Sequence, residues 1–470
     1  MKLINLIKNE LTKILHKPSL YVLFVIVIAL NIFVIFIDTI VPVEVIGMAT
    51  VKPNIKDYDM KNEEEVTMFI DNMTEYDVAQ AARKYDFYSA EYYYIDTELV
   101  DLFRCMNEVK YGKVPEKEAN ECKSNFDLAM ASLENYDWKN NLTNKKADLT
   151  KRLQELKEDS PTYKEDKVVL TAEIEVIDYR LKNDIYPSYK ISSAELDEWI
   201  GYSQAYYSWD KEDVKYNEDE LKQKEEATKN YMILKYKMDH EMIKANYNET
   251  PTNNLLSCVK SLDFFSLICL IMVAGSIISE EFNKGTIKQL LVRPYSRIKI
   301  LTSKIIATLI IFLIFFFLSN GLRLIIDCIG YNAFNNLSTP IVLFDYAKET
   351  VFGMNIFSYS LLCFVSILPL YLLIMLGVLL VSIITTNNGI SSAVGYMLFL
   401  ASDIFILFSN NRIVSYLPIT TADLNPYLFG GSSPYKYATL GSSLLVDIIT
   451  FIVLIALSLF LFKKKNIKNQ

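Results

Sequence analysis

The residues with the clearest chemical pattern lie in one segment, Ser279–Lys304, between two apolar runs. It begins with paired carboxylates, passes through a glycine and a hydroxyl, and ends with basic residues around a proline. Charges in this order perform no bond chemistry by themselves. They suit a short helix that lies on a membrane surface and is held by another protein. The residues we expect to act there are Glu280, Glu281, Gly285, Thr286, Leu290, Arg293, Pro294 and Arg297.

The rest of the chain offers no credible catalytic or metal-binding set. Its two histidines, His16 and His240, stand far apart, and no cysteine or histidine cluster has the spacing of a zinc site. The Gly112-Lys113 pair lacks the upstream glycine and the following hydroxyl of a phosphate-binding loop. We therefore expect a chain that is not an enzyme, holds no metal and does not itself hydrolyse ATP.

The charged segment resembles the coupling segment of type 2 ATP-binding-cassette exporter permeases, which reads roughly S-E-E-x-x-x-G-T-[IL]-x-x-L-L-x-x-P-x-S-R. The resemblance implies that a separate cytoplasmic ATP-binding subunit, carrying ATP and magnesium, docks on this segment. It also implies a second permease chain, identical or different, and contact with membrane lipids. The matching positions are Ser279, Glu280, Glu281, Gly285, Thr286, Leu290, Leu291, Pro294, Ser296 and Arg297.

Apolar residues make up 51% of the chain and are clustered, which is unusual for a soluble protein. Runs of about 18–25 apolar residues match a hydrocarbon core about 30 Å thick. The expected fold class is an all-α membrane protein with six transmembrane helices, an N-terminal interfacial elbow helix and a mainly helical extracellular domain. The six runs are Leu20–Ile37, Leu262–Ser279, Ile305–Ile326, Ser358–Ile384, Ile390–Phe408 and Ser443–Phe462.

Lysine and arginine clusters precede the first run, lie between the second and third, and follow the last. Six crossings place all three clusters on one side, which the positive-inside rule makes the cytoplasm. Both termini are then cytoplasmic, in the plasma membrane. The insert is acidic: residues 41–250 hold 45 Asp and Glu against 29 Lys and Arg, a net charge of −16. The expected domains are the elbow helix 1–19, the first span 20–37, the extracellular domain 38–257, and spans two to six in 258–470 with the coupling loop 280–304.

Residues 1–17 place leucines and isoleucines on one helical face and lysines on the other. This pattern predicts a helix in the headgroup layer before Pro18 turns the chain into the membrane. The alternative is a basic leader that only sets topology. No basic patch with interleaved aromatics lies outside the membrane-proximal clusters, so we expect no nucleic-acid partner.

Within the insert, leucines and isoleucines at helical spacing on both sides of Pro161 predict an antiparallel helical hairpin. Cys105 and Cys122 are a possible disulfide pair in an oxidising compartment. An aromatic stripe with 3-4-3 spacing follows the hairpin; it either packs the core of the domain or recognises a peptide or lipid. Its members are Trp199, Tyr202, Tyr206 and Trp209.

Ionisable residues inside membrane spans are expensive and mark functional or structural positions. Arg323 and Asp327 stand four residues apart, so they can pair along one helix. Asp403 and Asp447 are expected at a similar depth in the fifth and sixth spans. One hypothesis is a polar cluster at the outer mouth of a pathway; the alternative is that each group is hydrated or holds helices together.

The leading hypothesis is a permease subunit that exports an amphipathic or hydrophobic substrate, such as a peptide, lipid or drug, with ATP hydrolysed by its partner. Sodium extrusion by the same architecture is a variant. A different class of function is a non-transporting membrane sensor of extracellular peptides. Transport predicts substrate-stimulated ATP hydrolysis by the partner, whereas a sensor predicts peptide binding without ATP-dependent flux.

Overall fold

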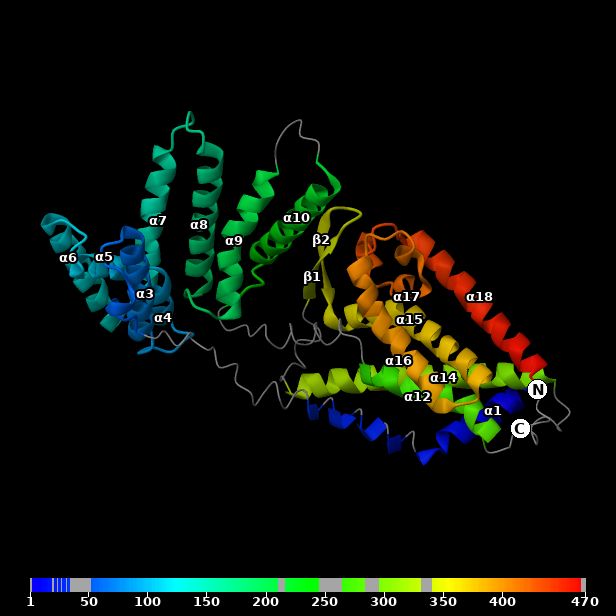
Figure 1. Cartoon of the computed structure of the whole chain (residues 1–470). Helices are drawn as coiled ribbons and strands as arrows, with labels where there is room; N and C mark the ends of the chain where they lie inside the picture. Colours follow the sequence, from blue (N-terminus) through cyan, green and yellow to red (C-terminus); the bar gives the residue numbers. More distant parts are fainter. Residues whose placement is uncertain are drawn as a thin grey trace. The chain divides into compact units, whose positions relative to one another are not determined.

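The computed structural model describes residues 2–18, 21–22, 24–26, 28–30, 32–33, 52–209, 216–244, 264–283, 296–330 and 340–465. The chain is mostly helical and divides into two compact units (Figure 1). Unit 1 comprises Met1–Val41 and Pro251–Gln470, and unit 2 comprises Pro42–Thr250. This division lies close to the insert boundaries expected from sequence.

Unit 1 contains the long apolar helices. Its elements are α1 (Lys2–Leu15), α12 (Phe264–Asn283), α14 (Arg297–Gly330), β1 (Pro340–Asp345), β2 (Thr350–Asn355), α15 (Ile356–Thr385), α16 (Asn388–Phe405), α17 (Pro418–Thr421) and α18 (Leu440–Lys464), with 3-10 turns at Ile406–Phe408, Val414–Tyr416 and Asn425–Gly430. Among the described residues, α14, α15 and α18 are long and apolar enough to cross a membrane. This indicates a membrane protein. The three helices cover the third, fourth and sixth expected runs.

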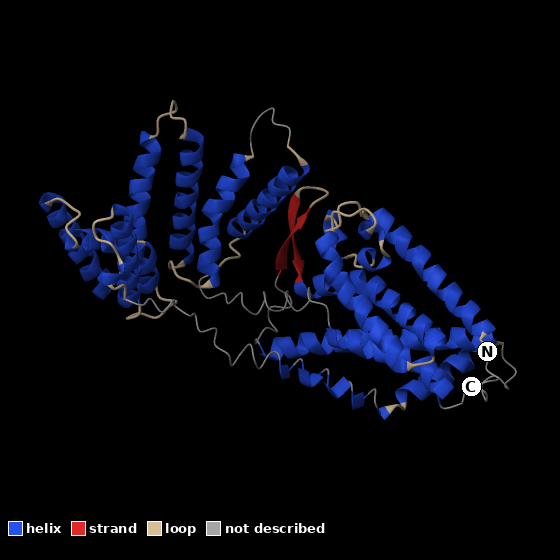
Figure 2. Ribbon diagram, in the orientation of Figure 1, coloured by secondary structure: helices blue, strands red, loops and turns tan. Residues whose placement is uncertain are grey.

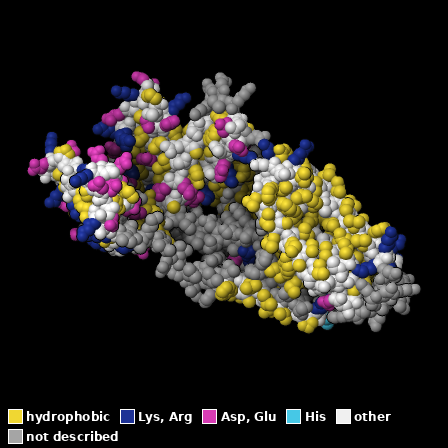
Figure 3. Space-filling view, viewed as in Figure 1, with side chains coloured by type: hydrophobic (Ala, Val, Ile, Leu, Met, Phe, Trp, Pro, Cys, Tyr) yellow, Lys and Arg dark blue, Asp and Glu magenta, His cyan; other side chains and the backbone are white. Residues whose placement is uncertain are grey.

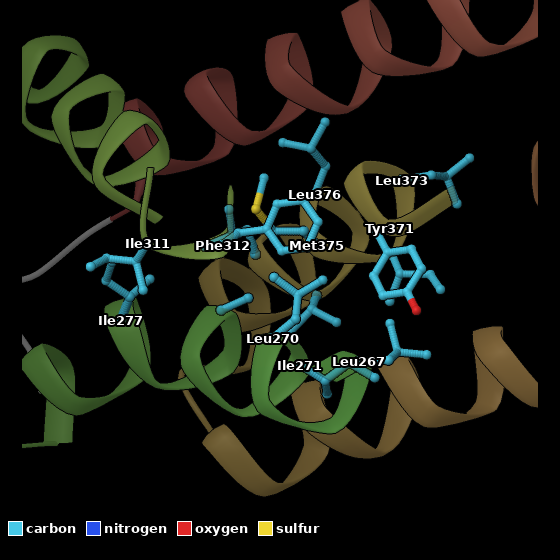
Figure 4. Packing of buried hydrophobic residues seen from close by; sticks show 14 of the residues in the cluster. Leu267, Leu270, Ile271, Ile277, Ile311, Phe312, Tyr371, Leu373, Met375 and Leu376 are labelled. Carbon is cyan, nitrogen blue, oxygen red and sulfur yellow. The ribbon is translucent and has the colours of Figure 1, made fainter. Parts of the chain in front are cut away.

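Helix α15 is the centre of unit 1 and packs against α12, α16 and α18. Its buried side chains interlock with those of α12 and α14, and Figure 4 shows Tyr371, Phe312 and Leu270 in this cluster. A Cβ on Gly395 would lie 2.6 Å from Val378 Cγ2. Small residues at such crossings let membrane helices approach closely. Apolar side chains spread over the visible outer face of these helices (Figure 3).

The expectation of an all-α fold is wrong at one place, the antiparallel hairpin of β1 and β2 (Figure 2). Ile341 pairs with Met354 and Leu343 with Phe352 across it. Glu349 has a φ of 50° at the turn, and the hairpin is joined to the 3-10 turn after α17 by the Tyr346 amide, which donates to the Phe429 carbonyl at 2.8 Å.

Unit 2 is built of helical pairs. Its elements are α3 (Glu63–Ala82), α4 (Ala90–Thr97), α5 (Val100–Lys110), α6 (Glu116–Ser132), α7 (Trp138–Glu155), α8 (Tyr163–Asn183), α9 (Ile191–Ser208) and α10 (Glu218–Asp239), with 3-10 turns at Ile55–Asp57 and Leu133–Asn135. The expected hairpin is present as α7 and α8, and α9 and α10 continue the row (Figure 1). Leu142, Leu149, Leu170 and Ile177 form the buried seam between α7 and α8.

A disulfide joins Cys105 on α5 to Cys122 on α6, with the Cα atoms 6.2 Å apart. The bond closes a 17-residue separation, for which the chain-entropy model gives about 3 kcal/mol of stabilisation. We expect reduction, or the double variant Cys105→Ser/Cys122→Ser, to lower the urea midpoint of unit 2. The three tryptophans, Trp138, Trp199 and Trp209, all lie in unit 2, so intrinsic fluorescence follows this transition. A reductant should lower the urea midpoint of the wild type and leave that of the double variant unchanged. An equal shift of the midpoint in both proteins would contradict the prediction.

Candidate functional site

Three segments that are distant in sequence meet at a buried ionic cluster formed by Glu10, Lys13, Glu281 and Lys304. Lys304 Nζ donates to Glu10 Oε2 at 2.8 Å and lies 2.7 Å from Glu281 Oε1. Lys13 Nζ bridges the same two carboxylates, at 3.2 Å from Glu10 Oε1 and 3.3 Å from Glu281 Oε1. The cluster therefore joins α1 to the last turn of α12 and the first turns of α14.

Burial distinguishes these contacts from surface ion pairs. The side chain of Lys304 is fully buried, and those of Glu10 and Glu281 are 5% and 11% exposed. Lys13 stands at the edge, with 47% of its side chain exposed. A buried charge that loses its partner costs far more than an exposed one. Loss of any one of the three buried members would therefore leave a buried charge with fewer partners.

A second ion pair extends the cluster along α1 and α12. Lys17 Nζ lies 3.0 Å from Glu280 Oε1 and donates to Ser276 Oγ at 3.3 Å. Both glutamates expected at the start of the coupling segment thus bind lysines from the N-terminal region. They also lie within α12, which continues to Asn283, rather than in a loop that begins at residue 280.

Helix α1 packs against the rest of unit 1 through one face. Its buried residues are Leu6, Glu10 and Ile14, which are spaced four residues apart. This spacing puts all three on one face of the helix. Ile14 packs into the main core of unit 1. Helix α1 is the helix expected over residues 1–17, and it is fixed to unit 1 by both apolar and ionic contacts.

Arg297 has a role that the sequence did not indicate. Its Nη1 donates to the carbonyls of Lys463 at 3.0 Å and Lys465 at 2.9 Å, so it caps the C-terminal end of α18. Lys465 Nζ in turn donates to the carbonyls of Ile383 and Ile384 near the end of α15. The ends of α14, α15 and α18 are therefore tied together by cations bound to helix-terminal carbonyls.

The other expected coupling residues, Gly285, Thr286, Leu290, Arg293 and Pro294, lie outside the described residues. Their flanks are defined, since α12 ends at Asn283 and α14 begins at Arg297. The ionic cluster joins both flanks through Glu281 and Lys304.

Three of the four polar residues expected inside the spans have described partners. Arg323 Nε lies 3.9 Å from Asp327 Oδ2 on α14, as an i,i+4 pair. Asp447 on α18 is buried and accepts a hydrogen bond from Thr421 Oγ1 of α17 at 2.9 Å. Asp403 lies on α16, and its side chain is outside the description. Asp447 is thus bound to α17 rather than to a charge on α14.

The aromatic stripe of α9 contributes mainly to the core of unit 2. Trp199 is 4% exposed and stacks on Tyr231 of α10, with ring centroids 4.9 Å apart. Tyr206 stacks on the same ring at 4.2 Å. Tyr202 donates to Glu198, and Trp209 contacts Tyr216 edge to face. Three of the four stripe residues are therefore explained by packing within the unit.

The second half of the chain matches a known protein family. Residues 230–468 match a family model described as "Protein of unknown function (DUF2705)". The chain belongs to this DUF2705 family. The matched region includes Glu281 and Lys304, whereas α1 and most of unit 2 precede it.

A curated relative of the chain is the "Uncharacterized protein YhcI" of Bacillus subtilis (strain 168). It is 30% identical over 207 residues, which is 42% of this chain and 64% of that protein. The alignment thus covers less than two thirds of the relative's length. No solved structure matches the chain.

The ionic cluster predicts a pH dependence outside the neutral range. Burial raises the pKa of Glu10, but the ammonium groups of Lys304 and Lys13 outweigh it and hold this pKa below 4.5. Burial lowers the pKa of Lys13, but Glu10 and Glu281 outweigh it and hold this pKa above 10.5. Glu10 therefore contributes stability above 4.5 that is lost as the pH falls through its folded-state pKa, and Lys13 contributes stability below 10.5 that is lost as the pH rises through its own.

We expect the thermal midpoint of the purified chain to be flat near neutrality and to fall on acidification below 4.5. Glu10→Gln should have a lower midpoint near neutrality and a weaker acid dependence, because the titrating carboxyl is gone. Heating in detergent over a pH series, followed by size-exclusion chromatography, measures both. An acid limb of the same steepness in Glu10→Gln would show that other groups cause it.

Proposed function

We propose that this chain is the membrane-spanning permease subunit of an ATP-binding-cassette transporter that exports an amphipathic or hydrophobic substrate. ATP is hydrolysed by a separate cytoplasmic subunit, and a second permease chain completes the pathway. The observation that carries the proposal is the ionic cluster, which joins both flanks of segment 284–296 to α1. The S-E-E…G-T…L-L…P-x-S-R pattern of residues 279–297 supports the same conclusion.

The mechanism follows from these contacts. An ATPase that closes on ATP pushes the segment between α12 and α14. Because Lys304 binds both Glu281 and Glu10, and Lys13 binds the same two carboxylates, the two helices and α1 move as one body. Helix α15, packed on α12, transmits the motion into the core. A rigid connection matters here, since a loose one would dissipate the push in loop motion.

The test must avoid residues that hold the fold. Alanine at Glu281 would remove one of the two carboxylates that bind the buried Lys304. Loss of a partner subunit in that variant could then result from damage to the fold. Arg293→Ala changes a residue of the segment itself, and Lys299→Ala on the exposed side of α14 is the matched control. Each variant is affinity-purified from native membranes, and mass spectrometry identifies its companions.

An ATP-binding subunit that accompanies the wild type and Lys299→Ala, but is depleted with Arg293→Ala, supports the proposal. Its ATP hydrolysis, reconstituted with the chain in lipid vesicles, should rise when an exported amphipathic substrate is added. The absence of any ATP-binding subunit from the wild-type sample would overturn the proposal and favour a membrane sensor.

A further inference from the structure

Unit 2 contains a hollow of about 260 Å³ between α8, α9 and α10. The residues that line it include Lys167 and Glu175 of α8, Trp199, Ser203 and Tyr207 of α9, and Tyr231 of α10. Ligand pockets for drug-sized molecules hold about 300–1,000 Å³. This hollow is slightly smaller, so it suits one bulky side chain rather than a whole molecule of that kind.

The wall of the hollow is aromatic, with a defined inner and outer part. Trp199 and Tyr231 are 4% and 7% exposed and form the inner part. Tyr207 is 46% exposed and meets Tyr231 edge to face at 5.8 Å, so it forms the outer lip. Aromatic faces provide large apolar contact area and attract cations.

Ser203 is the observation that points to a ligand. Its side chain is 3% exposed, and its hydroxyl has no hydrogen-bond partner among the described residues. A buried polar group without a partner costs about 1–3 kcal/mol. Most such groups in native proteins are satisfied. A polar atom of a bound molecule would satisfy this one, because Ser203 lines the hollow.

The carboxylate beside the hollow favours a cationic ligand. The exposed carboxylate of Glu175 accepts from Trp199 Nε1 at 2.9 Å, which fixes it beside the aromatic wall. Lys167 also lines the hollow, but its ammonium lies over the ring of Tyr163, 5.4 Å from the ring centroid. Glu175 is therefore the charged group that is hydrogen-bonded to the aromatic wall, and residues 41–250 have a net charge of −16.

We propose that this hollow binds a cationic peptide, with one bulky apolar side chain between Trp199, Tyr207 and Tyr231 and an adjacent basic side chain paired with Glu175. A backbone group of the peptide hydrogen-bonds to Ser203. The proposal goes beyond the transport function and does not require it, since binding is measured without ATP or flux.

The experiment uses the full chain in phosphatidylcholine nanodiscs. Trp138→Phe and Trp209→Phe leave Trp199 as the sole tryptophan and therefore as the reporter. The probe is an acetylated tetrapeptide amide of alternating leucine and lysine, and the control peptide has glutamate in place of lysine. We expect a saturable change in Trp199 emission with the lysine peptide and none with the glutamate peptide.

Two variants test the assigned contacts. Glu175→Gln keeps an acceptor for Trp199 but loses the charge, and should weaken binding about threefold to fivefold, the strength of an exposed ion pair. Glu173→Gln, two residues earlier on α8, should leave binding unchanged. Ser203→Ala should weaken binding without lowering the urea midpoint, because it removes a group that is unsatisfied in the free protein.

No saturable signal with the lysine peptide would overturn the proposal. Equal binding of the glutamate peptide, or an unchanged affinity in Glu175→Gln, would also overturn it. Short-chain phosphatidylcholine added in place of the peptide should leave the emission unchanged. The same saturable response to that lipid would assign the hollow to lipid and contradict the peptide.

Discussion

A Lys304→Met variant should lose on the order of 10 °C of thermal stability in detergent. The substitution removes the ammonium that binds both Glu10 and Glu281 and leaves their carboxylates in a buried site. Removing one member of a buried ionic set costs about 3–5 kcal/mol. For folding units of 150–250 residues, 1 kcal/mol corresponds to about 2–4 °C. The fraction that remains monomeric after heating, read by size-exclusion chromatography, gives the midpoint.

Two controls distinguish charge pairing from general damage to α14. Lys299→Met removes an exposed lysine five residues earlier on the same helix and should change the midpoint little. The triple variant Glu10→Met/Glu281→Met/Lys304→Met removes the three buried charges together and leaves Lys13, which is 47% exposed and can be hydrated. It should recover most of the loss, because apolar replacement of buried ionic groups is often neutral or stabilising. A triple variant as unstable as Lys304→Met would contradict this account.

The triple variant also separates stability from function. If the cluster only holds the fold, a stable apolar replacement should keep substrate-stimulated ATP hydrolysis by the partner subunit. If the connection must be rigid and specific in register, as we propose, the stable triple variant should lose that stimulation. Methionine is flexible and specifies position poorly, so the expected result is a folded and uncoupled chain.

How far the site could be predicted depends on the residue. The Glu280-Glu281 pair was evident from sequence, because two carboxylates at the end of an apolar run are unusual. Glu10 was missed, although it is an acidic residue in phase with Leu6 and Ile14 on an apolar face. An acidic residue at a position that helical spacing places on the buried face indicates a buried basic partner. The partner itself, Lys304, is 294 residues away, and periodicity carries no information about such distant contacts.

The fold shows the same division between local and distant information. Helical spacing predicted α7 and α8 on the two sides of Pro161, but the second helix begins two residues after this proline, at Tyr163. Before it, Ser160 Oγ accepts a hydrogen bond from the amide of Thr162 at 3.4 Å. The β1–β2 hairpin, at residues 340–355, has no counterpart among the elements expected from sequence. The spacing of apolar residues predicts that a helix forms. The residue at which it begins depends on side-chain hydrogen bonds to the backbone, which compete with those of the helix.

In unit 2, Arg180→Met should lower stability by about 3 kcal/mol. Arg180 is 2% exposed and donates to Ser193 Oγ at 2.7 Å, to the Ser193 carbonyl at 3.0 Å and to Asp197 Oδ1 at 2.7 Å. Asp197 also accepts from Tyr93 Oη at 3.0 Å, so the arginine links α8, α9 and α4. Removing it leaves several buried groups unpaired, at about 1–3 kcal/mol each. Asp197 is 38% exposed, which allows water to replace part of that loss.

Urea unfolding followed by tryptophan fluorescence measures this effect, since all three tryptophans report on unit 2. Arg180→Lys keeps the charge but loses the planar fork that reaches both Ser193 and Asp197; it should fall between the wild type and Arg180→Met. Arg152→Met, on the exposed face of α7, is the matched control and should leave the midpoint in place. If Arg180→Lys equals the wild type, charge alone holds the link and the geometry of the fork contributes nothing. If Arg180→Met and Arg152→Met have the same urea midpoint, α8, α9 and α4 are held together by their apolar contacts. The hydrogen bonds of the buried arginine would then add no stability to unit 2.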